Sequence, residues 1–142
     1  MFRVAVGLLL LLSLPLAAPS QAAGGPPLPA RPCRAQPALV GRCFHVRGRL
    51  SLYNGAPTIR LWRAGTRRLL GVSASYAREG YGSIPEELES RLTWENELWG
   101  EFLVCPFTRR RPGEMQMVCV ESARGVVSRP RPGAAPRGGS ER

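Results

Sequence analysis

The strongest constraint on the fold is a run of alternating apolar and polar residues from Phe44 to Tyr53. Successive side chains of a strand point to opposite faces of a sheet, so this run predicts a strand with one buried and one exposed face. The dipeptide Asn54-Gly55 follows directly and is a strong signal for a hairpin turn. Residues 58–63 alternate again and predict the returning strand. The two runs therefore commit this part of the chain to antiparallel β-structure.

Three further strands and one short helix are predicted after this hairpin. The expected segments are, in order, strand 68–72, helix 84–94, strand 99–107 and strand 114–121. Pro112-Gly113 is a turn signal between the last two strands, and Ser83-Ile84-Pro85-Glu86 is typical of a capped helix start. We expect an all-β fold with one short helix. Its order matches a small five-stranded β-barrel of the oligonucleotide/oligosaccharide-binding (OB-like) type, with a transthyretin-like β-sandwich as the alternative.

Gly48 interrupts the first alternating run, in the middle of the predicted strand. A glycine inside a strand often marks a bulge or a bend, because it has no side chain to pack. We therefore expect one of these two features at Gly48.

The two ends of the chain differ in composition from its middle. Residues 1–22 combine a basic Arg3, a short apolar run and the small residues Ser20 and Ala22, which is the layout of a cleavable signal peptide. The apolar run is shorter than the roughly 20 residues of a membrane-spanning helix. Residues 23–37 are rich in Pro, Gly and Ala and are expected to be a linker, and residues 128–142 a disordered Arg/Pro/Gly tail.

These boundaries leave one β domain, residues 38–127, in a protein exported to the periplasm or secreted. All 20 basic residues are Arg, all 10 acidic residues are Glu, and the net charge is +10. Such a charge attracts nucleic acids and anionic surfaces. However, a GC-rich coding bias produces the same excess of Arg, and export argues against nucleic acid. An anionic envelope component or a protein is the expected partner.

The chain contains four cysteines, Cys33, Cys43, Cys105 and Cys119. An even number of cysteines in a short exported chain predicts disulfides. Their spacing is too long for a zinc framework, and we expect no metal site and no cofactor. Cys105 and Cys119 lie at equal distances from Pro112, which places them opposite one another in the predicted hairpin. We expect Cys105–Cys119 and Cys33–Cys43 pairs, although four cysteines allow two other pairings.

The alternation places Arg47, Arg49, Arg60 and Trp62 on the outward face of the first two strands. An arginine beside an aromatic ring binds anions or sugars by charge and stacking. These four residues are therefore the candidate ligand-binding site, with stacking on Trp62 and charge from Arg60. The alternative is that another part of the chain covers Trp62.

Catalysis has weaker support. His45 is expected on the exposed face of the first strand, and no Gly-x-Ser-x-Gly nucleophile elbow accompanies it. Glu86, Glu87 and Glu89 fit the first turn of a helix, where the helix dipole favours acids, better than a glycosidase pair. We assign no catalytic residue and predict a non-enzymatic binding module. A hydrolase and an envelope-associated structural protein that acts through its basic tail are the alternatives.

Two blocks of the sequence resemble a known group of proteins. The first block contains Cys43-Phe44-His45-Val46-Arg47-Gly48-Arg49-Leu50, Tyr53-Asn54-Gly55 and Pro57-Thr58-Ile59-Arg60-Leu61-Trp62. The second contains Phe102-Leu103-Val104-Cys105-Pro106 and Gly113-Glu114-Met115-Gln116-Met117-Val118-Cys119-Val120-Glu121. They resemble small exported proteobacterial proteins of unknown function, which implies a periplasmic location and a Cys105–Cys119 pair. The first block also faintly resembles the opening of transthyretin-like sandwiches.

Overall fold

The computed structural model describes residues 32–73 and 82–133. The expected signal peptide, linker residues 23–31 and tail residues 134–142 lie outside the described residues. Within the described residues, the chain has no helix with the length and apolar composition needed to cross a bilayer.

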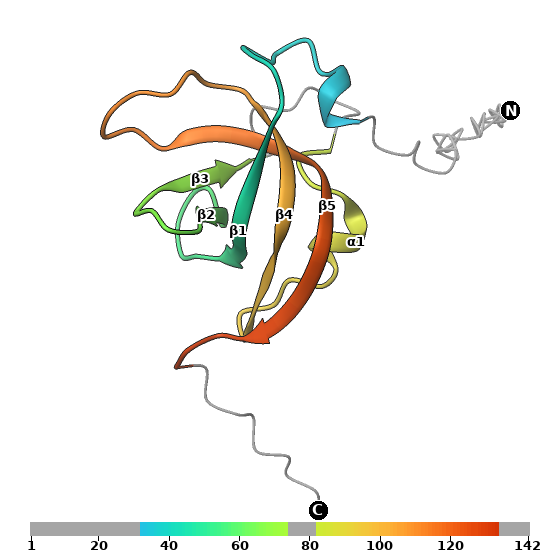
Figure 1. Ribbon diagram of the computed structural model, residues 1–142, viewed down its shortest axis with the longest axis vertical. Coiled ribbons are helices and arrows are strands. Elements are labelled where there is room, and N and C mark those ends of the chain that lie inside the picture. The colour runs from blue at the N-terminus through green and yellow to red at the C-terminus, as the bar shows by residue number, and fades with distance from the viewer. Residues whose placement is uncertain (1–31, 74–81, 134–142) are drawn as a thin grey trace, which may run out of the picture.

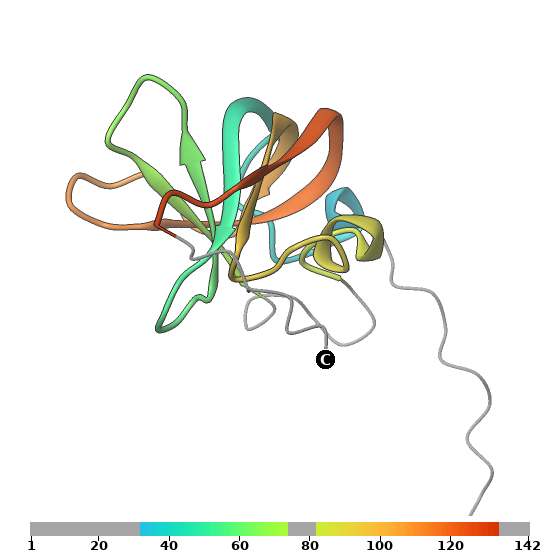
Figure 2. The same cartoon turned by 90° about the horizontal axis from the view of Figure 1, so that it is seen from below.

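Five strands form one sheet that closes on itself, as Figures 1 and 2 show from two directions. The strands are β1 (Phe44–Leu52), β2 (Ile59–Arg63), β3 (Leu69–Val72), β4 (Asn96–Pro106) and β5 (Gln116–Pro130). Their order around the barrel is β1-β2-β3-β5-β4, and β4 pairs with β1 to close it. Only β3 and β5 run parallel among these pairs. The predicted all-β barrel is confirmed, and the sandwich is wrong because the described strands form one sheet and not two.

The interior of the barrel is filled by apolar side chains from all five strands. Twelve buried residues form this cluster: Val46, Leu50, Leu61, Leu70, Val72, Ile84, Leu88, Leu98, Phe102, Val104, Val118 and Val120. The inward positions of the first hairpin are those that the alternation predicts, since Leu50 lies opposite Leu61 and both are fully buried. The local period of two therefore defines the core side of β1 and β2.

The helix is shorter than predicted. It forms the single turn α1 (Glu86–Glu89), and Leu88 points into the core. Ser83 does not cap it. Its carbonyl accepts a hydrogen bond from the Val120 amide of β5 at 2.8 Å, so the segment before α1 is held against the sheet. The helix begins at Glu86, and Pro85 takes the N-cap position without a side-chain hydrogen bond.

The domain extends beyond the predicted limits of 38–127 at both ends. The 3-10 turn η1 (Cys33–Ala35) and the buried Gln36 belong to it. At the other end, β5 continues to Pro130, and Ser128, Arg129 and Pro130 pair with β4. The end of the predicted linker and the start of the predicted tail are therefore part of the fold. Composition missed this extension of β5 because its side chains are mostly exposed and need not be apolar.

β1 serves two neighbours at once. Phe44–Leu50 pair with β4, and Gly48–Leu52 pair with β2. The β1–β4 register runs through Gly48 without a shift and the β1–β2 register begins at this residue, so the pairing shows no bulge there. Instead the backbone carbonyl of Trp62 lies where a side chain would begin, and a Cβ at position 48 would overlap it. Gly48 thus permits a close approach of β1 and β2.

We expect Gly48→Ala to push β2 away from β1 and to lower the free energy of unfolding by about 1–3 kcal/mol, the usual cost of overpacking. Urea unfolding followed by tryptophan fluorescence measures this loss. Gly41→Ala is the matched control, because its Cβ would make an ordinary contact with Pro106 at 3.4 Å. Equal stability of the two variants would contradict the close approach at Gly48.

The four cysteines form two disulfides, but the predicted pairs are wrong. The bonds are Cys43–Cys105 and Cys33–Cys119. The hairpin register itself is as predicted, since Cys105 lies directly opposite Cys119. However, the pairing of Phe44 with Val104 also brings Cys43 beside Cys105, with their Cα atoms 4.0 Å apart. Cys33 then reaches Cys119 from η1, across a Cα separation of 6.0 Å. Closure of the barrel, and not the hairpin, decides the pairing.

This pairing is directly testable, because cleavage by trypsin after Arg42, Arg47 and Arg109 separates all four cysteines. A non-reducing digest should link the Cys43 peptide to the Cys105 peptide, and a Cys105–Cys119 link would contradict the structure.

Each disulfide closes a long loop, with sequence separations of 62 and 86 residues. Replacing either pair by serines should therefore cost up to about 4 kcal/mol of unfolding free energy on the chain-entropy model.

Candidate functional site

The outward face of β2, β1 and β4 carries a row of stacked aromatic and guanidinium groups. The strand registers place Arg49 opposite Trp62 on one side and opposite Trp99 on the other. The guanidinium carbon of Arg49 lies 5.1 Å from the ring centroid of Trp62 and 5.9 Å from that of Trp99. The two indoles meet edge to face, with centroids 5.8 Å apart. Trp62 is therefore on the predicted face, but its neighbours half-bury it.

Arg49 is also neutralised inside the fold. Its Nη1 donates a hydrogen bond to Oε2 of Glu97 at 3.1 Å and lies 2.9 Å from Oε1 of the same carboxylate. Glu97 is only 3% exposed, so this ion pair is largely removed from water. A guanidinium that is stacked between rings and paired with a buried carboxylate has little capacity left for a ligand. Arg49 supports the site and does not present a free charge there.

Arg60 makes its contacts at the turn between β1 and β2. Its guanidinium carbon lies 5.0 Å from the ring centroid of Tyr53, and its Nε donates to the carbonyl of Pro57 at 3.0 Å. Arg131 stacks on the same ring at 5.3 Å. These contacts engage Arg60 with the turn, and joint ligand binding by Arg60 and Trp62 stays a prediction.

An open groove of about 780 Å³ lies beside the aromatic row, over β1, β4 and β5. We call it the Trp99 groove. Gly48 and Gly100 lie opposite each other in this groove and present no side chains. The side chains that shape it are those of Arg47, Trp99, Glu101, Arg124, Val127 and Arg129. The groove thus combines an indole, an exposed aliphatic group and three guanidinium groups.

The charge of the Trp99 groove is positive. Oε1 of Glu101 accepts a hydrogen bond from Arg124 at 2.7 Å and lies 2.9 Å from Nδ1 of His45. The hydrogen bond from Arg124, and then its charge, hold the pKa of Glu101 below its ordinary value, with smaller help from His45 and Arg47. Glu101 is therefore ionised at neutral pH. Three arginines against one glutamate leave two net positive charges along the groove.

Arg129 connects the two features. Its guanidinium carbon lies 5.2 Å from the ring centroid of Trp99, and it lines the groove. A guanidinium that stacks by its face keeps its N–H edge available to a carboxylate. Arg129 can therefore accept an anion without leaving the indole.

Sequence reasoning found Arg47 but missed Trp99, Arg124 and Arg129 as members of this site. The sequence places Trp99 at the start of a strand and near the glutamates considered for a glycosidase pair, but its place in the groove depends on the long-range register of β4 against β1. Arg124 and Arg129 lie where apolar alternation is weak, so no local pattern marks their strand. The high proportion of arginine in the second half of β5 is the sequence feature that could have indicated a binding surface there.

His45 is exposed, as predicted, and its ring pairs with Glu101. A histidine held by a carboxylate is two-thirds of a catalytic triad. In the part of the chain that the structure describes, no serine or threonine hydroxyl is hydrogen-bonded to His45. The contact therefore identifies no nucleophile, and we assign no catalytic role to His45.

One group of potential metal ligands also occurs among the described residues. Atoms of Cys33, Cys105 and Glu121 lie within 4.8 Å of one another. Both sulfurs belong to disulfides, and Glu121 is paired with Arg34. Metal binding by cysteine requires a thiolate, so this group is not assigned as a metal site.

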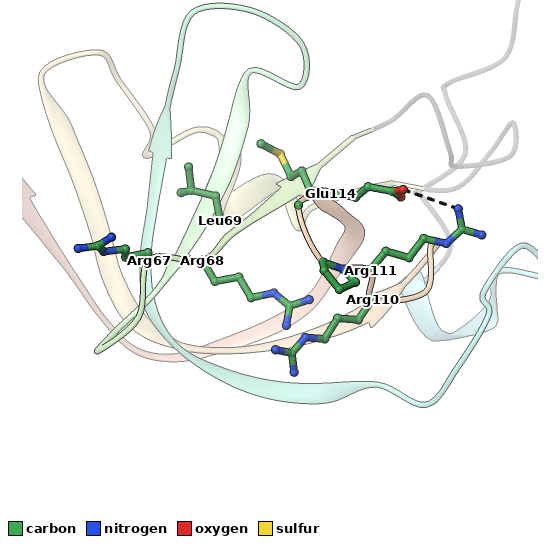
Figure 3. Close-up of a pocket in the computed structure, with 9 residues that line it drawn as sticks. Arg67, Arg68, Leu69, Arg110, Arg111 and Glu114 are labelled. Carbon is green, nitrogen blue, oxygen red and sulfur yellow. Dashed lines mark ion pairs between the residues drawn. The ribbon is translucent and has the colours of Figure 1, made fainter.

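A second groove lies between the β2–β3 turn and the β4–β5 turn (Figure 3). Its volume is about 360 Å³, and it is lined by Arg67 and Arg68 from one turn and by Arg110 and Arg111 from the other. In Figure 3 Arg67 points away from the β4–β5 turn, and Arg111 points toward Glu114. The sequence predicts only a solvated loop for the run Arg109-Arg110-Arg111. These residues are indeed exposed, but two of them also line a groove that folding assembles from distant turns.

No protein-family model, curated protein or solved structure matches this chain. The resemblance to small exported proteobacterial proteins therefore stays an expectation.

The Arg49–Glu97 pair can be tested by a double-mutant cycle. Arg49→Met keeps much of the side-chain volume but leaves a buried carboxylate without its partner, which should cost about 3 kcal/mol of unfolding free energy. Adding Glu97→Gln removes the orphaned charge and should recover part of the loss. Chemical denaturation of the four proteins measures the coupling. Strictly additive losses would contradict a structural role for the pair.

Proposed function

We propose that this chain is a non-catalytic binding module of an exported protein, and that the Trp99 groove holds an acidic saccharide. The observation that carries the proposal is the meeting of one indole and three arginines along a single open groove. Arginine pairs with carboxylate or sulfate groups through two parallel hydrogen bonds, and an aromatic ring packs against the apolar face of a sugar. An acidic sugar carries both features.

The shape of the groove supports a chain-like ligand. Its volume of about 780 Å³ lies in the range of small-molecule sites, yet it is open along its length. Val127 lines it with 53% of its surface exposed, although a large aliphatic side chain gains free energy when it is covered. Arg47 and Arg124, both exposed, stand over the same groove. A ligand with an apolar face and acidic groups satisfies all of these surfaces.

Export agrees with the covalent chemistry of the domain. The two disulfides use all four cysteines, and such bonds persist in oxidising compartments. The signal-like residues 1–22 support the same location. An acidic polysaccharide of the cell envelope is then an accessible partner.

Two other functions stay untested. A tail-driven envelope protein would depend on residues 134–142, which lie outside the described residues. A hydrolase would need a nucleophile or a pair of acids around His45 and Glu101. Deleting residues 134–142 removes this tail and leaves the described residues in place. If the Trp99 groove is the site, the shortened protein should bind the saccharide as tightly as the full chain.

Titration calorimetry with oligogalacturonate, and with a neutral oligosaccharide of equal length, tests the proposal. We expect the acidic ligand alone to bind the mature protein. The double variant Arg47→Ala/Arg124→Ala should weaken binding about tenfold or more, because each charge-assisted hydrogen bond contributes roughly 1.5–3 kcal/mol. Arg42→Ala is the matched control, since Arg42 is exposed and lines neither groove. Equal affinities of the double variant and the control would refute the site.

A further inference from the structure

The second groove brings together four arginines, most of which have no carboxylate partner among the residues that the structure describes. Arg67 and Arg68 come from the β2–β3 turn, and Arg110 and Arg111 from the β4–β5 turn. Among the described lining residues, Glu114 is the only acid. Its carboxylate lies 3.8 Å from Nη1 of Arg111 in an exposed pair, and such pairs are weak. Three of the four guanidinium groups therefore lack a carboxylate partner within residues 32–73 and 82–133.

Arg68 is held in place from below by a buried amide. Its Nη2 donates to Oε1 of Gln116 at 2.8 Å, and Nε2 of Gln116 donates to the carbonyl of Thr108 at 3.0 Å. Gln116 is only 7% exposed, so this chain of hydrogen bonds is shielded from water. The amide can satisfy the guanidinium and the carbonyl only in this orientation. Arg68 is therefore a fixed group and not a freely moving surface charge.

The parallel pairing of β3 with β5 sets the two walls of the groove side by side. It places Leu70 opposite Gln116, two residues after Arg68 on one side and one residue after Met115 on the other. In Figure 3 the ends of Arg68 and Arg110 turn toward the same space. Partial burial, followed by the charges of Arg110 and Arg63, lowers the pKa of Arg68. Two like charges that converge without a counterion repel one another, and an anion between them removes that cost.

We propose that this groove, here called the Arg68 groove, is a second binding site that takes a phosphoryl group, either as free phosphate or as a phosphate monoester. A tetrahedral phosphoryl dianion has acceptor oxygens on several sides, so it can bridge guanidinium groups on opposite walls. A planar carboxylate presents its two oxygens toward one side. The volume of about 360 Å³ and the adjoining Leu69 and Met115 leave room for an organic group beside the phosphate.

This site is independent of the Trp99 groove, because the two grooves share no lining residue. The two proposals can therefore fail separately. Arg47→Ala/Arg124→Ala, which alters the Trp99 groove, should leave phosphate binding unchanged.

NMR titration of the disulfide-bonded protein with inorganic phosphate, at constant ionic strength, tests the Arg68 groove. We expect shifts of the Arg68 and Arg110 side-chain resonances and of the turn amides. Arg110→Gln should weaken binding at least tenfold. Arg109→Gln is the matched control, since Arg109 is exposed on the same turn but does not line the groove. Glu114→Gln should tighten binding severalfold, because it removes the carboxylate that competes for Arg111. Thermal unfolding of each variant checks that it is folded.

Further arms of the experiment identify the source of the phosphate. Glucose 6-phosphate is compared with glucose, and phosphatidylcholine vesicles with phosphatidic acid are compared with vesicles without it. Tighter binding of glucose 6-phosphate than of phosphate indicates a soluble monoester, and vesicle capture that depends on Arg110 indicates a lipid headgroup. Either result, or binding of phosphate alone, supports the site. Equal phosphate affinity of Arg110→Gln and Arg109→Gln, or no binding at millimolar phosphate, would overturn it.

Discussion

The shared backbone pairing of β1 is the interaction on which the rest of the structure depends. One strand bonds to β4 along its first part and to β2 along its second, which closes the sheet and removes its edges. Gly48 lies where both pairings overlap, and only a glycine admits the Trp62 carbonyl there. The same registers place Arg49 between two tryptophans and Cys43 beside Cys105. The hydrophobic core, the row of stacked tryptophan and arginine side chains and the Cys43–Cys105 disulfide thus all depend on the pairing of β1 with its two neighbours.

The arginines of this basic chain have different roles in the closed barrel. Arg49 is neutralised by buried Glu97 and stacked between indoles, and Arg60 is stacked on Tyr53. These arginines serve the fold, where the planar guanidinium both packs and donates hydrogen bonds. The arginines of the two grooves line open space instead, although Arg68 is held by Gln116, Arg124 by Glu101 and Arg129 by Trp99. Net charge alone does not separate these two groups, because the difference lies in what surrounds each side chain.

The grooves depend on different parts of the topology. The Trp99 groove needs the long β5, which continues past the core and brings Arg129 over Trp99. The Arg68 groove needs the parallel pairing of β3 with β5, which sets two turns side by side that are far apart in sequence. Both grooves lie on the outside of a closed sheet, since apolar side chains fill its interior. A small barrel therefore has its surface and its turns available for binding.

The sequence by itself determined the five strands apart from the extension of β5, the first hairpin and the outward position of Trp62, because the period of two is a local property of neighbouring residues. It also placed Cys105 opposite Cys119, since a turn defines the register of its own hairpin. Only the tertiary structure decided that Cys105 bonds to Cys43, that Arg49 pairs with Glu97, and that the two grooves form. Each of these depends on the register between strands distant in the chain, and no local pattern of residues specifies that register.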